Sequence, residues 1–65
     1  MINRKFKVGD RVKISEPWEG YERYRNSSGI IYDIGNFYDV RFDNGEEDCF
    51  HFCEMSLEKK QNWDL

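Results

Sequence analysis

Two cysteines and the only histidine of the protein lie within one short run, Cys49-Phe50-His51-Phe52-Cys53. Thiolate and imidazole are ligands that zinc prefers, so this run is the first candidate for metal chemistry. In an extended strand the two cysteines would lie about 13 Å apart, whereas two sulfurs on one zinc ion lie within about 4.6 Å of each other. The chain has no other cysteine or histidine to complete a ligand set. The sequence therefore predicts free thiols, with neither a metal site nor a disulfide.

The same run could in principle supply a nucleophile and its base. On one face of a strand, Cys49 and His51 would lie about 7 Å apart, which allows a loose contact only. An activated thiol needs a hydrogen-bonded base that is oriented by a third group. We therefore expect a half-exposed cysteine, a surface histidine, no enzymatic activity and no cofactor.

Acidic residues gather just before this run, around the dipeptide Asn44-Gly45. Their composition resembles that of a calcium loop, but Arg41 stands where such a loop needs an oxygen ligand. The ordinary expectation is a solvated acidic tip over residues 43–48, able to steer a basic partner surface. Its carboxylates belong to Asp43, Glu46, Glu47 and Asp48.

A second candidate site is the segment 15–28, which has neither a helical nor a strand period and reads as a long loop. It carries three aromatic residues at three-residue spacing, Trp18, Tyr21 and Tyr24, together with Arg23 and Arg25. Two interpretations remain open. The rings could fold over the end of the core, because a small β domain needs its large apolar residues. They could instead be exposed, as the tryptophan, tyrosine and arginine of an interface.

These candidates have to be positioned by a β-hairpin over residues 38–52. Apolar and charged side chains alternate along residues 38–43, as in a strand with one buried face. Asn44-Gly45 tolerates positive φ at both positions, which suits a tight hairpin turn. The returning strand should alternate too, with two phenylalanines toward the core and a cysteine and a histidine on the other side: Phe50 and Phe52, and Cys49 and His51.

The rest of the chain also favours strands. Residues 6–14 alternate, with Val12 and Ile14 expected to point inward. Residues 30–34 break strict alternation, as in a bent strand contributing to two sheets, and Gly35-Asn36 provides a second turn, so that three strands form a meander. Residues 53–58 suit a single helical turn, with Met55 or Leu57 plugging the core. Residues 59–65 could add a short closing strand with Trp63 as an anchor, or fray.

The length and the charge of the chain bear on its domain organisation, its stability and its partners. The 65 residues form one domain, 1–65, which buries only about 60% of its unfolded surface and depends on its many aromatic residues for a core. The net charge of −3 is distributed unevenly along the sequence, because residues 1–13 are basic and residues 42–58 are acidic. The two ends could attract each other, or they could form a bipolar binding surface. No apolar run or leader pattern is evident, so we expect a cytoplasmic protein without a membrane partner.

Four stretches together resemble the SH3-like small barrels of the Tudor and KOW type: residues 8–14, 29–34, 38–45 and 50–58. The resemblance implies an all-β fold, a five-stranded, strongly bent SH3-like barrel with a long loop between its first two strands and a single helical turn before the last. Such barrels bind peptides, modified side chains, nucleic acid or larger proteins, so the resemblance does not select a function. The acidic and aromatic signature of polyproline-binding SH3 domains is not evident. The size also resembles that of small bacterial or bacteriophage accessory proteins.

The preferred function is a non-enzymatic module that binds a protein partner, monomeric by default. Its expected contact residues lie in the loop and at the acidic tip: Trp18, Tyr21, Arg23, Tyr24, Arg25, Asp43, Glu46, Glu47 and Asp48. The alternative is nucleic-acid binding by basic residues of the first strand and the loop: Arg4, Lys5, Lys7, Arg11, Lys13, Arg23 and Arg25. A pI near 5.0 argues against this alternative, because nucleic-acid-binding domains are usually basic.

Overall fold

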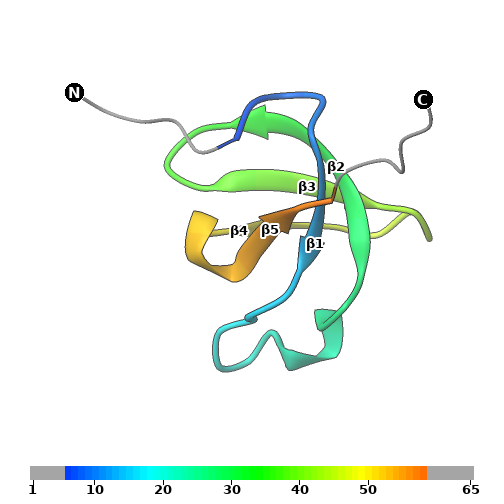
Figure 1. Cartoon of the computed structure of the whole chain (residues 1–65), viewed down its shortest axis with the longest axis vertical. Coiled ribbons are helices and arrows are strands. Elements are labelled where there is room, and N and C mark those ends of the chain that lie inside the picture. Colours follow the sequence, from blue (N-terminus) through cyan, green and yellow to red (C-terminus); the bar gives the residue numbers. More distant parts are fainter. Residues whose placement is uncertain (1–5, 59–65) are drawn as a thin grey trace, which may run out of the picture.

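The computed structural model describes residues 6–58 and contains five strands and two short 3₁₀ helices. In chain order these are β1 (Arg11–Ile14), η1 (Glu22–Tyr24), β2 (Ser28–Ile34), β3 (Tyr38–Phe42), β4 (Glu47–Phe50), η2 (Phe52–Glu54) and β5 (Met55–Leu57). All strand pairs are antiparallel and form one sheet in the order β4-β3-β2-β1-β5 (Figure 1). The all-β prediction with five strands, a long β1–β2 connection and a helical turn before the last strand is confirmed at this level.

The sheet has two edges, β4 and β5. Between residues 6 and 58 no pairing joins these two strands, so the sheet is open in its hydrogen bonding and the predicted barrel closure is not observed. β2 pairs with β1 on one side and with β3 on the other, and its register shifts between Ile31 and Asp33. This irregularity accounts for the broken alternation of residues 30–34, but the strand serves one sheet and not two.

The β3–β4 turn differs from its prediction. Gly45 has a φ of +95°, whereas Asn44 keeps a negative φ. The amide of Gly45 donates to the Phe42 carbonyl at 2.9 Å, and the Phe42 amide donates to the Glu46 carbonyl at 2.7 Å. The Asn44 side chain accepts from the Glu46 amide at 2.9 Å. The loop is therefore of the three-residue kind that ends with a left-handed glycine, and the expectation of positive φ at both central positions is wrong.

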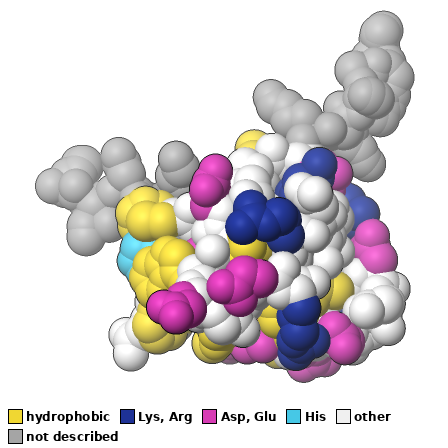
Figure 2. Space-filling view, turned by 90° about the horizontal axis from the view of Figure 1, so that it is seen from below, with side chains coloured by type: hydrophobic (Ala, Val, Ile, Leu, Met, Phe, Trp, Pro, Cys, Tyr) yellow, Lys and Arg dark blue, Asp and Glu magenta, His cyan; other side chains and the backbone are white. Residues whose placement is uncertain are grey.

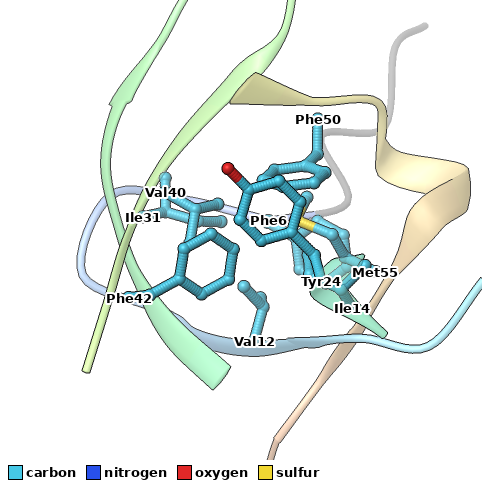
Figure 3. Packing of buried hydrophobic residues seen from close by; sticks show 9 residues of the cluster. All are labelled: Phe6, Val12, Ile14, Tyr24, Ile31, Val40, Phe42, Phe50 and Met55. Atoms are coloured by element: carbon cyan, nitrogen blue, oxygen red, sulfur yellow. The ribbon is translucent and has the colours of Figure 1, made fainter. Parts of the chain in front are cut away.

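One face of the bent sheet holds the core (Figure 3). Except for Phe52, the residues of β1 and of the hairpin that were expected to point inward are buried. They pack with one residue of β2, with one ring from the β1–β2 connection, and with Phe6 and Met55. The buried cluster consists of Phe6, Val12, Ile14, Tyr24, Ile31, Val40, Phe42, Phe50 and Met55. Tyr21, Ile34 and Tyr38 pack against it and are half-buried.

The segment after Phe50 departs most from the sequence prediction. Strand alternation stops there, because Phe52 begins η2 and its side chain is 43% exposed. The expectation that Phe52 faces the core is therefore wrong. The helical turn lies at residues 52–54, earlier than expected, and Met55 and Leu57 belong to β5, where only Met55 is buried. The closing strand expected over residues 59–65 lies outside the described residues.

Candidate functional site

A buried carboxylate joins the β1–β2 connection to η2. The Glu54 side chain is only 3% exposed, and its two oxygens accept backbone hydrogen bonds from two segments. Oε1 accepts from the Trp18 amide at 3.0 Å, and Oε2 accepts from the His51 amide at 2.9 Å. The Glu54 backbone carbonyl also accepts from the amides of Ser15 and Glu16, at 2.9 and 3.0 Å. One residue therefore fixes the start of the loop against the helical turn.

The turn η2 has a capping box, which explains how His51 is oriented. His51 is the N-cap residue, and Glu54 stands at position N3 and returns the bond to the His51 amide. The Nδ1 atom of His51 accepts from the Cys53 amide at 3.2 Å. Because Nδ1 is the acceptor, the neutral ring carries its hydrogen on Nε2. Local capping thus fixes the plane of the imidazole ring.

Trp18 lies on this imidazole. The two rings are stacked, with centroids 5.1 Å apart and planes 24° apart. The Phe52 ring packs on the same imidazole, with centroids 4.5 Å apart, and Phe37, from the β2–β3 connection, meets the imidazole edge-on with centroids 6.4 Å apart. Trp18, Phe37 and Phe52 are 48%, 45% and 43% exposed, whereas His51 is half-buried. We call Trp18, Phe37, His51 and Phe52 the aromatic patch; Figure 2 shows the single histidine, in cyan, among hydrophobic side chains.

The three loop aromatics divide between the two interpretations left open by the sequence. Tyr24 is buried, stacks on Phe42 with centroids 4.9 Å apart, and meets Phe50 edge-on at 5.2 Å. Tyr21 is half-buried and packs edge-on against Phe50 at 5.4 Å. Trp18 alone among the three is exposed. Tyr21 and Tyr24 therefore cover the core, and Trp18 faces solvent.

The structure brings part of the predicted loop site and part of the predicted tip together around Tyr24. Its hydroxyl donates to Asp48 Oδ2 at 2.9 Å and accepts from Arg23 Nη2 at 2.7 Å. The Arg23 guanidinium lies 4.2 Å from the Tyr24 ring centroid and reaches Glu46 at 3.7 Å. Burial, followed by the hydrogen bond to Asp48, raises the pKa of Tyr24. These contacts tie η1 to the hairpin.

The remaining acidic residues of the tip are also engaged. Arg11 makes two hydrogen bonds to Asp43, at 3.1 and 2.7 Å, which lower the pKa of that carboxyl group. Glu47 accepts from the Tyr32 hydroxyl and from Arg41, both at 3.0 Å, and these bonds lower its pKa. The tip is therefore acidic in sequence but largely paired in the structure.

A shallow hollow of about 190 Å³ lies beside the tip. It is smaller than the usual site for a small molecule of about 300 Å³ or more. The hollow is lined by Ser27, Ser28, Phe42, Asp43, Asn44 and Glu46.

The basic residues proposed for nucleic-acid contacts do not gather on one surface as free cations. Lys7 pairs with Asp10 at 3.2 Å, and Arg11 pairs with Asp43 and, at 3.4 Å, with Glu58. Arg25 reaches the Ser15 carbonyl at 3.5 Å. Within residues 6–58, Lys13 and Arg25 are the predicted basic contacts without an ion pair, while Arg4 and Lys5 lie outside the described residues.

The two cysteines differ in their exposure to solvent. Cys49 is half-buried and Cys53 is exposed, and both are free thiols. Burial, followed by the nearby Asp48 and Asp39 carboxylates, raises the pKa of Cys49 and so keeps the thiol protonated. In the described part of the chain, no three metal-ligating side chains come together, and no helix has the length and hydropathy to cross a membrane.

Sequence reasoning missed most of the aromatic patch. It assigned Phe52 to the core, treated His51 as an isolated surface residue and assigned no role to Phe37. It also missed Glu54, which holds Trp18 in place. The available signal was the three-residue spacing from His51 to Glu54, because an N-cap residue followed by glutamate at N3 is the pattern of a capping box.

Comparisons with protein families, with curated proteins and with solved structures find no match to this chain. The geometry of the aromatic patch and its surroundings is therefore what indicates a function.

Proposed function

We propose that the protein is a non-enzymatic binding module that engages a protein partner through the aromatic patch. The observation that carries this proposal is an exposed tryptophan held in one position. Its amide is bound by Glu54, its carbonyl accepts from the Tyr21 amide at 2.8 Å, and its ring lies on His51. A side chain held in this way loses little further entropy on binding, which favours affinity.

Glu54 supports the proposal on energetic grounds. A buried carboxylate costs free energy unless hydrogen bonds compensate for the lost solvation. Here the compensating bonds go to the backbone beneath an exposed ring, and not to the sheet. Tryptophan is also enriched among the residues that dominate interface energetics.

The acidic tip and the loop arginine have a supporting role in this proposal. Arg23, Tyr24, Glu46 and Asp48 bond to one another, so they fix the far end of the loop. The proposed partner contact is therefore smaller than the one predicted from sequence. It consists of the exposed tryptophan of segment 15–28 and the rings beside it, and not of the whole segment.

We also propose that the open sheet belongs to the SH3-like barrels of the Tudor and KOW type. The strand order, the long β1–β2 connection and the turn η2 before β5 support this assignment. Two free cysteines fit a reducing compartment, which supports a cytoplasmic location.

Site-specific photo-crosslinking tests the protein-binding function. We expect p-benzoylphenylalanine in place of Phe52 to capture a discrete protein from a cell lysate, with the same yield after nuclease treatment. The matched control places the same residue at Tyr32, which is exposed but bonded to Glu47 outside the patch. Capture that is equal at both positions, or lost with nuclease, would contradict the proposal; the second result would favour nucleic-acid binding.

A further inference from the structure

The three segments that build the aromatic patch share one charge. Trp18 comes from residues 15–22, Phe37 from residues 33–39, and His51 and Phe52 from residues 48–54. None of these segments contains a lysine or an arginine. All of their charged residues are acids: Glu16, Glu19, Glu22, Asp33, Asp39, Asp48 and Glu54.

Contacts show that several of these carboxylates lie close to the patch. Glu54 binds the amides of Trp18 and His51 directly. Tyr21, whose amide bonds to the Trp18 carbonyl, has its pKa raised first by the negative charge of Asp48. Asp39 of β3 lies directly opposite Cys49 of β4 in the antiparallel register. Acidic residues therefore lie close to the patch on the side of the β1–β2 connection and on the side of η2.

Within residues 6–58, three of the four arginines make their contacts away from the patch. Arg11 bonds to Asp43, Arg23 lies over Tyr24, and Arg41 bonds to Glu47. The fourth, Arg25, donates to the Ser15 carbonyl at the base of the loop, at 3.5 Å. In Figure 2 the hydrophobic group around the histidine has acidic side chains at its border, and the lysine and arginine side chains lie in the middle of the view and on the side away from the histidine.

We propose that the aromatic patch binds a cationic segment of the partner, in which lysine or arginine flanks an apolar side chain. This inference rests on the proposed protein-binding function and adds the chemistry of the partner. The apolar side chain packs on the exposed rings of Trp18 and Phe52. The neighbouring cation lies against a ring face and near the exposed Glu16 and Glu19, where it gains both a cation–π contact and charge attraction.

Three matched peptides test this inference with the intact, ¹⁵N-labelled protein. One contains lysine and leucine separated by glycine, the second replaces each lysine with glutamate, and the third replaces each leucine with serine. We expect the lysine–leucine peptide to bind about tenfold more tightly than either of the others. Its signals should shift at the patch residues, and raising NaCl from about 50 mM to about 300 mM should weaken binding severalfold.

Three variants locate the site. Trp18→Ala should weaken binding of the lysine–leucine peptide about tenfold, whereas Ile30→Ser, at an exposed apolar residue of β2, should leave it unchanged. Glu19→Lys should weaken binding severalfold through charge alone. Circular dichroism of each variant confirms that it is folded.

The outcomes separate this inference from the function on which it rests. Equal or tighter binding of the glutamate–leucine peptide would overturn the cationic partner, while dependence on Trp18 would still support a binding patch. Equal binding of the lysine–serine peptide would indicate non-specific charge attraction and overturn the inference. If none of the peptides shifts the NMR signals of the patch residues, the inference is also wrong. The crosslinking at position 52 then tests the protein-binding function independently.

Discussion

Glu54 and Trp18 form an unusual pair at the scale of single residues, because the most buried charge in the described chain supports one of its most exposed rings. Both oxygens of the carboxylate are used, one for each segment that it joins. Nothing in the polarity of Glu54 distinguishes it from the surface acids that surround it in sequence. Its role follows from the spacing to His51, which places it at the third position of a helical turn.

Glu54→Gln tests this role. Glutamine keeps one oxygen acceptor but turns an amide group toward a backbone donor, so one buried N–H loses its partner. We expect the free energy of unfolding to fall by about 1–3 kcal/mol and the emission of Trp18 to shift toward that of an exposed indole. Urea unfolding followed by fluorescence in a Trp63→Phe background measures both. Glu19→Gln, at an exposed acid, is the control and should change neither quantity.

At the scale of elements, strands could be predicted from sequence where the alternation of apolar and polar side chains matched their burial in the structure. Alternation identified β1, β3 and the hairpin, because Val12, Val40 and Phe50 do point into one core. It failed after Phe50, where local capping by Glu54 starts a helical turn and overrides the continued alternation. β5 has three residues and, among the strands described between residues 6 and 58, pairs with β1 alone, so its sequence contains too little pattern to reveal a strand.

Close approach between β2 and β3 gives a prediction at the element scale. A Cβ added at Gly29 would lie 2.8 Å from the Phe42 Cα and still closer to the Arg41 carbonyl oxygen. Both neighbours are backbone atoms, which cannot move without separating the strands. We therefore expect Gly29→Ala to destabilise the protein by about 3 kcal/mol or more, measured by thermal unfolding.

Gly35→Ala is the matched control for this substitution. Gly35 lies in the β2–β3 connection, its φ is not positive, and no atom lies within 4 Å of its added Cβ. Its effect should stay within about 0.5 kcal/mol. Equal destabilisation by the two substitutions would show that β2 and β3 are not held this closely.

At the scale of the whole molecule, the charge polarity of the chain is partly used to join its two halves. Arg11, at the start of β1, bonds to Asp43 in the hairpin tip and to Glu58 after β5. The sequence left open whether the polarity was internal or served binding. These pairs show that the charge of Arg11 holds parts of the chain together. The acids around the aromatic patch have no such basic partners in their own segments. Sequence alone could not make this division, because it depends on which strands become neighbours.

The Arg11–Asp43 pair also predicts a pH dependence. The hydrogen bonds from Arg11 lower the pKa of Asp43 below its usual 3.8. A lowered carboxyl pKa stabilises the folded state above the usual value, and this contribution is lost as the pH falls through the folded pKa. Stability should therefore decrease below about pH 4, and Asp43→Asn should remove part of that decrease. Urea midpoints between about pH 2 and pH 6 measure the effect, with Glu19→Gln as a control that keeps the wild-type profile.

The hydrogen bond between Trp18 and Glu54 spans 36 residues of the chain. Closing a loop of this length costs entropy that is repaid only when both ends have docked, so contacts of this range form late in folding. A chain emerging from the ribosome cannot make the bond until Glu54 has been synthesised, and a fragment limited to the β1–β2 connection lacks its acceptor. The geometry of the aromatic patch is therefore a property of the completed fold, and a folding intermediate that has formed only the hairpin does not yet present it.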